Sequence, residues 1–413
     1  MARELEHPDW VRRLNLFGNA VGDPSHVVSL DVDELLALAR KTTGLDDLGD
    51  AEWPGWEDTY RRLVRSIDSE SQLHLLGRVV TRAEVLRILQ TWLRLQEAWT
   101  ADLSIAQITI DEPLFVVGPP RTGTTILLEL LALDPQLRAP IAWEALYPLD
   151  ERTADRNPLV LAEAEQEFWA DVHPEFATMH ELRSDLPCEC VHFLSYDFAG
   201  PYWSMLYDTP TFTGWQLEHL DTVSRVYRLH RRMLQTFARN DGADRRWLLK
   251  TPGHLQNLPT LFAEYPDARV IHTHRDPRKF IASLVSLLRV VRFMRSDRVE
   301  PNLGPMMEMT YKFFLEQVIE QRTSGAIPDD RIVDTHFLDL MADPVAMLRS
   351  VYERLSLDWP TGHDDRIRGY LAAKPKDKHG AHRYEFADVG LDEAGVRASF
   401  APYVAHYGIA EES

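Results

Sequence analysis

The chain has 413 residues, 45% of them hydrophobic, which is enough for one large α/β domain with a helical appendage or for two to three domains. Its 64 acidic and 45 basic residues give a net charge of −19, a surface that repels nucleic acid and anionic membranes. An anionic ligand would therefore need a local cluster of basic side chains.

The cysteines and the apolar segments indicate the compartment. Cys188 and Cys190 are too close for an ordinary structural disulfide, and no set of His and Cys residues completes a zinc site. This pattern predicts a reducing compartment. The N-terminal residues do not resemble a signal peptide, and no uncharged apolar run reaches the ~18 residues of a membrane-spanning helix. We therefore expect a cytoplasmic protein without a transmembrane segment.

Residues 1–105 are predicted to be helical and to pack on the rest of the chain. Asp31 can cap one helix, and Pro54 can open another. Thr81 and Glu84 form a capping-box pattern before a segment with helical apolar spacing. This part contains no polar constellation, so we expect a helical layer that covers the core or shapes a substrate entrance.

Residues 106–413 are predicted to form an α/β domain. Short apolar or β-branched strands alternate with helical patterns, and they occupy residues 114–117, 247–249, 269–273 and 331–335. This alternation predicts βαβ units, and therefore a P-loop-like parallel sheet flanked by helices. Ligands bind such sheets beyond the carboxyl ends of the strands.

A helical and loop-like insertion is expected at residues 151–240. Its middle is rich in aromatic residues between Phe193 and Trp215. These residues are expected either to form the wall of a pocket for an apolar substrate or to form ordinary core beneath a long loop.

The first strand of the α/β part leads into a turn that is predicted to bind an anion. Gly118 and Gly123 have the spacing of the nucleotide-binding pattern G-x-x-x-x-G-K-[ST], but Thr124 replaces the Lys. The cation lies within the turn instead, as Arg121. Backbone N–H groups, this guanidinium and the hydroxyls of Thr124 and Thr125 would face the anion, and either threonine can cap the helix. The alternative is a tight strand–helix turn with an incidental Arg.

Two further strand ends carry cations. Arg275 follows the 269–273 strand, and Ser283 follows in the helix that Asp276 and Pro277 begin, so the Arg and Ser are predicted to hold one phosphate. Further basic residues follow as far as residue 298, and some of them are expected to be solvated. Lys250 ends the 247–249 strand and either points at the crevice or extends its ammonium into water.

Four motifs, PPRTGTT, LLKTPGHL, HRDPRKFIASL and DKHGAHRYEF, together resemble the sulfotransferases that use 3′-phosphoadenosine 5′-phosphosulfate (PAPS). The resemblance is greatest to the bacterial branch with Arg in the first loop, a branch related to the tyrosylprotein and cytosolic sulfotransferases. It covers the chain from about Pro113 onward. It implies transfer of a sulfuryl group from PAPS to a hydroxyl, with release of adenosine 3′,5′-bisphosphate (PAP).

The resemblance also implies which residues bind the donor. The residues that match the 5′-phosphosulfate loop are Arg121, Thr122, Gly123, Thr124 and Thr125. Arg275 and Ser283 match the pair that binds the 3′-phosphate. The residues that match a late basic loop closing over the nucleotide are Lys378, His379 and Gly380.

The resemblance also implies catalytic roles. Lys250 corresponds to a lysine near the transferring sulfuryl group, and Arg121 would share in stabilising its charge. In the tyrosylprotein branch the base is a Glu downstream of the loop Arg, at a spacing that Glu144 matches. His254 is the alternative base, although Pro252 and Gly253 shift it from the position that the cytosolic enzymes use. Because side-chain cations can replace Mg²⁺, and the chain has no obvious metal-carboxylate motif, no metal is expected.

The leading hypothesis is thus a PAPS-dependent sulfotransferase that acts on a hydroxyl of a small, apolar acceptor. The alternatives are a P-loop nucleotide kinase or NTPase, and a non-catalytic PAP-binding protein. The lysine missing after Gly123 argues against the first, and the presence of Lys250, Glu144 and His254 argues against the second. No pattern in the sequence indicates an oligomeric state.

Overall fold

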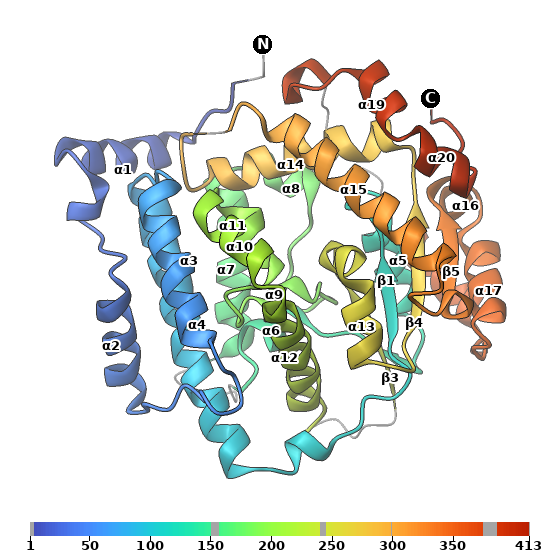
Figure 1. Ribbon diagram of the computed structural model, residues 1–413, viewed down its shortest axis with the longest axis horizontal. Helices are drawn as coiled ribbons and strands as arrows, with labels where there is room; N and C mark the ends of the chain where they lie inside the picture. The colour runs from blue at the N-terminus through green and yellow to red at the C-terminus, as the bar shows by residue number, and fades with distance from the viewer. Residues whose placement is uncertain (1–3, 150–156, 240–244, 299, 375–385, 413) are drawn as a thin grey trace.

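A computed structural model describes residues 4–149, 157–239, 245–298, 300–374 and 386–412 (Figure 1). Within these residues, five parallel strands form a sheet in the order β2-β3-β1-β4-β5. Helices surround the sheet, and the N-terminal helices lie on the side of the molecule away from it. The predicted α/β class with a parallel sheet is confirmed.

The strands lie close to their predicted positions. Their bounds are β1 (Leu114–Val117), β2 (Leu137–Arg138), β3 (Arg246–Lys250), β4 (Arg269–His274) and β5 (Ile332–His336). β2 was not predicted, because a two-residue strand is too short to show any periodicity. In the register of the sheet, Val116 of β1 pairs with both Lys250 and Ile271. The carboxyl ends of β1, β3 and β4 therefore lie side by side.

Alternate residues of β1 face two different cores, as the period of a strand requires. Leu114 and Val116 pack in one core with residues of helices that include α5 (Thr124–Leu131), α17 (Pro344–Arg354) and α18 (His363–Ala373). Phe115 and Val117 face the other core. That face packs against α12 (Asp221–Ala238), α13 (Leu258–Glu264), α14 (Pro277–Phe293) and α15 (Leu303–Thr323).

The remaining helices of the C-terminal part are short. They are α16 (Phe337–Ala342), α19 (Glu393–Ser399) and α20 (Ala401–Tyr407), and 3-10 turns lie at Pro252–Asn257, Asp329–Arg331 and Phe386–Val389. α20 contacts α15, and α19 contacts α14, so the last described residues return to the helix that follows β4.

The N-terminal helices are α1 (Asp9–Ala20), α2 (Val32–Thr43), α3 (Trp56–Glu70) and α4 (Leu75–Ala101), with 3-10 turns at Pro24–His26 and Ile105–Gln107. Asp31 caps α2 as predicted. The predicted helix start at Thr81 is wrong. α4 begins at Leu75 with His74 as its N-cap, and both Thr81 and Glu84 lie buried inside it. Glu84 receives a hydrogen bond from Arg295, which follows the end of α14. Its partner is therefore distant in the sequence, and Glu84 does not cap the start of α4.

The middle of the chain contains α6 (Ala142–Leu146), α7 (Pro158–Val172), α8 (Phe176–Met179), α9 (Val191–Leu194), α10 (Pro201–Leu206) and α11 (Pro210–Glu218). Its aromatic residues pack against the N-terminal helices. Phe198 lies 5.3 Å from Trp56 and 5.0 Å from Tyr60 between ring centroids, and Trp56 stacks on Trp92 at 4.4 Å. These rings are fully buried, so they are part of the core that joins the two regions. None of the described helices is both long and apolar enough to cross a membrane.

Candidate active site

The turn after β1 has three residues in positive-φ conformations. They are Gly118 (φ 146°), Arg121 (φ 69°) and Gly123 (φ 88°). Such a conformation is costly for a residue with a side chain, so the surroundings must hold Arg121 in place. Its carbonyl accepts a hydrogen bond from Nη1 of Arg275 at 2.7 Å. Its guanidinium donates to Ser283 Oγ at 3.0 Å and to the Met179 carbonyl at 2.8 Å.

A glycine at position 118 lets this turn pass close to β4. A Cβ atom there would lie 2.2 Å from Thr273 Oγ1 and 2.8 Å from the Thr273 carbonyl oxygen. Thr122 joins the same contact, because its hydroxyl donates to the Pro119 carbonyl and lies 2.6 Å from Thr273 Oγ1. The turn is thereby fixed against the end of β4.

The threonines that begin α5 differ in orientation. Thr124 is 3% exposed, whereas Thr125 is exposed and accepts a hydrogen bond from Lys250 Nζ at 3.3 Å. The predicted threonine cap is wrong, since the N-cap residue is Gly123 and no side chain caps α5. A helix that begins after a glycine in the left-handed conformation leaves its first N–H groups available to an anion.

Arg275 and Ser283 lie beside this turn, as the sequence predicts. Asp276 caps α14 through a hydrogen bond from the N–H of Arg278, which fixes where β4 ends and the helix begins. Arg275 lies over the ring of Phe337, 3.8 Å from its centroid. Together with the contacts of Arg121, this arrangement brings two guanidinium groups and a serine hydroxyl into one continuous polar site.

Lys250 lies at the end of β3 and forms an ion pair that the sequence did not predict. It is 2% exposed, and its ammonium contacts both Thr125 and the carboxylate of Glu189. The loop that carries Glu189 is fixed on both sides. The N–H of Cys190 donates to the Lys250 carbonyl, and the N–H of Cys188 donates to the Pro140 carbonyl, both at 2.8 Å.

The environment of Glu189 and Lys250 also shifts the pKa values of nearby groups. Burial disfavours the charged carboxylate, but the positive charge of Lys250 and its hydrogen bond to the carboxylate outweigh burial and lower the pKa of Glu189. Burial lowers the pKa of His180 to about 4 against the opposing charge of Glu189, and Lys250 and Arg121 add to the decrease. Near neutral pH, therefore, Glu189 is ionised and His180 is uncharged.

Glu144 lies in α6 and is 9% exposed. Its carboxylate accepts a hydrogen bond from Arg138 Nη2 at 2.6 Å. It also receives the N–H of Ile141, the N-cap residue of the helix, at 3.5 Å. These contacts explain its burial without reference to a ligand.

His254 lies in the 3-10 turn after β3 and is 1% exposed. Its Nδ1 is 2.9 Å from the hydroxyl of Tyr227, while its Nε2 is buried and has no hydrogen-bond partner among the described residues. Burial lowers the pKa of His254 to about 3. Its neighbours include His230 and Cys190, with one ligand-type atom of each within 4.8 Å of the others. His254 is therefore an uncharged, weakly basic side chain near neutral pH.

The remaining residues that the sequence predicted for the site are the late basic loop and the basic side chains after Arg275. Lys378, His379 and Gly380 lie outside the described residues. The basic residues after Arg275 include two that form buried ion pairs: Arg292 with Glu300 at 2.9 Å and Arg295 with Glu84 at 2.7 Å. These two join elements of the fold and are not solvated.

Sequence reasoning missed Glu189, His180 and the contacts of Glu412 described below. Glu189 lies in a loop between two cysteines, where no periodicity or motif marks it. The one available signal was an acidic residue within a largely apolar and aromatic segment.

Comparison with known proteins identifies relatives of the chain. The profile described as "Sulfotransferase family" matches residues 113–361. The chain is 26% identical over 280 residues to the omega-hydroxy-beta-dihydromenaquinone-9 sulfotransferase Stf3 of Mycobacterium tuberculosis, over 64% of this chain and 68% of that protein. The same values apply to Stf3 of Mycobacterium bovis.

Two solved structures share the fold over most of their length. The sulfotransferase STF1 of Mycobacterium tuberculosis is 28% identical with a TM-score of 0.75, covering 90% of this chain and 98% of that chain. The sulfotransferase STF9 of Mycobacterium avium is 24% identical with a TM-score of 0.80, covering 92% and 97%. The second likeness concerns the fold alone.

Proposed function

The chain belongs to the sulfotransferase family, and we propose that it transfers a sulfuryl group from PAPS to the hydroxyl of a small, apolar acceptor and releases PAP. Sulfuryl transfer to a hydroxyl is the activity of its family. The identity of the donor, the acceptor and the roles of individual residues form the proposal.

One observation carries the donor assignment: Arg121 and Arg275 are directly connected. Arg275 donates to the Arg121 carbonyl, and Arg121 donates to Ser283, so a single rigid unit presents two guanidinium groups. A donor with a phosphosulfate at one end and a phosphate at the other needs two such anion sites. We propose that Arg275 and Ser283 bind the 3′-phosphate.

We propose that the turn after β1 binds the phosphosulfate through Arg121, Thr122, Gly123, Thr124 and Thr125. Thr125 and the backbone N–H groups of the turn offer donors to the anion, while Thr122 and Thr124 keep the turn in shape. Lys378, His379 and Gly380 remain predicted to close over the nucleotide. When bound, PAPS supplies an activated sulfuryl group.

Because PAPS supplies the activated group, the side chains of the protein need only stabilise charge and transfer a proton. Lys250 and Arg121 stabilise the negative charge that develops on the transferring group and the departing nucleotide. Because these cations lie in the site, we propose that catalysis needs no metal ion, which predicts unchanged turnover after treatment with a chelator.

We propose Glu189 as the first candidate for the general base, ahead of Glu144 and His254. Glu189 contacts Lys250 and is ionised near neutral pH, so it is able to accept the proton of the acceptor hydroxyl. His254 is buried with a pKa of about 3, so it is a weak base near neutral pH, and Glu144, which is paired with Arg138, is the alternative carboxylate.

The acceptor is proposed to be a lipophilic molecule with a free hydroxyl. Stf3, whose name specifies a hydroxylated dihydromenaquinone, supports this class. We do not assign the ring cluster around Phe198 to the acceptor, because it lies in the core. A cytoplasmic location and the absence of nucleic-acid partners stay predictions from the sequence.

A binding measurement tests the donor assignment against the kinase alternative. PAP at a hundred times its Kd should stabilise the protein by about 2.7 kcal/mol and raise the Tm, while ATP with Mg²⁺ should have a much smaller effect. Stabilisation by ATP with Mg²⁺ but not by PAP would contradict the proposal and favour a P-loop kinase or NTPase.

A further inference from the structure

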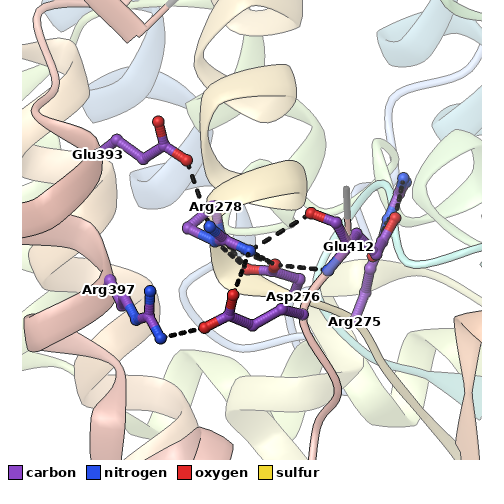
Figure 2. A network of polar contacts seen from close by, with 7 residues as sticks. Arg275, Asp276, Arg278, Glu393, Arg397 and Glu412 are labelled. Atoms are coloured by element: carbon purple, nitrogen blue, oxygen red, sulfur yellow. Dashed lines mark hydrogen bonds and ion pairs between the residues drawn. The ribbon is translucent and has the colours of Figure 1, made fainter.

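The guanidinium of Arg275 is occupied by a carboxylate of the same chain. Its Nε lies 2.9 and 3.1 Å from the two carboxylate oxygens of Glu412, and its Nη2 donates to one of them at 2.8 Å (Figure 2). The side chains of Arg275 and Glu412 are 20% and 10% exposed. This is a forked, largely buried ion pair, which is the geometry with which arginine also binds phosphate.

Two further contacts hold the rest of the Arg275 guanidinium. Nη1 donates to the Arg121 carbonyl, and the face of the guanidinium lies over Phe337. The edge formed by Nε and Nη2 is therefore the part of Arg275 that an anion can approach in a forked manner, and Glu412 takes both of its donors. A phosphate cannot bind that edge while the carboxylate is there.

The backbone at Glu412 is held by a separate contact. Its N–H donates to Asp276 Oδ2 at 3.0 Å, and Nη2 of Arg278 donates to its carbonyl at 3.3 Å. Asp276 and Arg278 form an ion pair with each other at 2.6 Å. Burial opposes ionisation of Asp276, but the bonds from Arg278 and from the Glu412 N–H outweigh it and lower the pKa of Asp276.

The residue before Glu412 adds to this attachment. Glu411 pairs with Arg397 of α19 and lies 3.8 Å from Arg278. Figure 2 shows that Arg397 and Glu393 approach the network from α19, opposite the side where Arg275 lies. The segment is thus placed by contacts that do not involve Arg275, and its Glu412 side chain is presented to Arg275.

We propose that Glu412 occupies the 3′-phosphate subsite as an intramolecular competitor, so that donor binding requires displacement of its carboxylate. This inference rests on the proposed function, which assigns Arg275 to the 3′-phosphate. A phosphate and a carboxylate placed on one guanidinium repel each other, so the two states exclude one another. The apparent Kd for PAP equals the intrinsic Kd divided by the fraction of molecules in which Glu412 has released Arg275.

Calorimetric titration with PAP tests the inference. Glu412→Gln removes the charge but keeps the size of the side chain, and it should tighten PAP binding about tenfold. Glu412→Ala should do the same, which guards against a new amide contact in the first variant. Glu218→Gln at the exposed end of α11 removes one negative charge elsewhere and should leave the Kd unchanged. The Tm of each variant shows that it is folded.

A double variant separates this inference from the proposed function. In an Arg275→Ala background, PAP should bind weakly. Adding Glu412→Gln should then give no tighter binding, because Glu412 competes with the phosphate only for the Arg275 guanidinium. If the native protein binds PAP and neither Glu412 variant binds it more tightly, the inference is overturned while the donor site stands. If neither the native protein nor any Glu412 variant binds PAP, both the donor site and the inference are overturned.

Discussion

At the scale of single residues, the site depends on charged side chains that are held by specific partners. Lys250 contacts Glu189, Arg121 contacts Ser283, and Arg275 contacts Glu412. The protein as a whole has a net charge of −19, so these cations act in a negative surrounding field. Their fixed positions, rather than the overall charge, are what would attract an anionic donor.

The pair of Lys250 and Glu189 leads to a prediction about catalysis. Glu189→Gln should lower kcat by about 10²- to 10⁴-fold with little change in the Kd for PAP, because an amide cannot accept the proton of the acceptor. Steady-state kinetics together with calorimetry would measure both quantities. Glu144→Gln is the matched comparison and should affect kcat much less. A variant series in which Glu189→Gln retains turnover while Glu144→Gln or His254→Ala abolishes it would place the base elsewhere.

Some of the site was predictable at this scale and some was not. Arg121, Lys250 and Arg275 were predicted to lie together because each stands at or just past the end of a recognisable strand, and parallel strands end at one edge. Ser283 was predicted to join them from within the helix that follows Arg275. Glu189 was missed because its role depends on its distance from Lys250, which no local pattern contains. Nor does the sequence bring Glu412 next to Arg275, since that contact forms only when the last helices pack on α14 and α15.

At the scale of elements, the turn between β1 and α5 is the most constrained part of the site. Gly118 allows the turn to approach β4, and Arg121 is held at a positive φ by Arg275. The same turn sets the direction in which α5 presents its N-terminus. The contacts that shape this turn therefore also set the geometry of the proposed anion site.

Gly118→Ala tests this constraint. The new Cβ would lie within 2.2 Å of Thr273 Oγ1, at a φ that disfavours any side chain. We expect a loss of about 2–4 kcal/mol in the free energy of unfolding, together with weaker PAP binding. Urea denaturation followed by circular dichroism would measure the first effect. Gly214→Ala, with no atom near its added Cβ, should be neutral or stabilising by comparison.

Element boundaries were predicted well where one signal dominated. The limits of β1 agree with the sequence, because glycine and prolines end a short apolar run. The start of α4 was misplaced because a capping-box pattern at Thr81 and Glu84 stood within a longer helix whose true cap is His74. Histidine is an unusual N-cap residue, so the sequence did not mark His74 as the start of the helix. The contact between Glu84 and Arg295, which buries Glu84, joins residues far apart in the sequence and so could not be predicted from a local pattern.

At the scale of the whole molecule, the buried histidines make the stability of the protein dependent on pH. Burial lowers the pKa of His74 and His274 to about 4 and that of His254 to about 3, from an ordinary value of 6.5. The unfolded chain binds these protons below pH 6.5, whereas the folded chain does not. The free energy of unfolding should therefore fall as the pH falls from 6.5 toward 4.

The expected slope is about 1.4 kcal/mol per pH unit for each buried histidine. Urea unfolding at pH 7, 6 and 5 would measure it. His254→Gln should reduce the slope by one such contribution, whereas His26→Gln at an exposed position should not change it. Equal or greater stability at pH 5 than at pH 7 would show that these histidines do not behave as the structure requires.

We propose that the turn after β1 and Lys250 catalyse the transfer of a sulfuryl group from PAPS to a hydroxyl. Incubation with radiolabelled PAPS and a hydroxylated, prenylated hydroquinone tests it directly. We expect label in the acceptor with the native protein and with Lys312→Ala on the partly exposed surface of α15. With Lys250→Ala, transfer should be about a hundredfold slower or more, at similar PAP affinity. Transfer at the native rate by Lys250→Ala, or no transfer from PAPS to any hydroxylated apolar acceptor by the native protein, would contradict it.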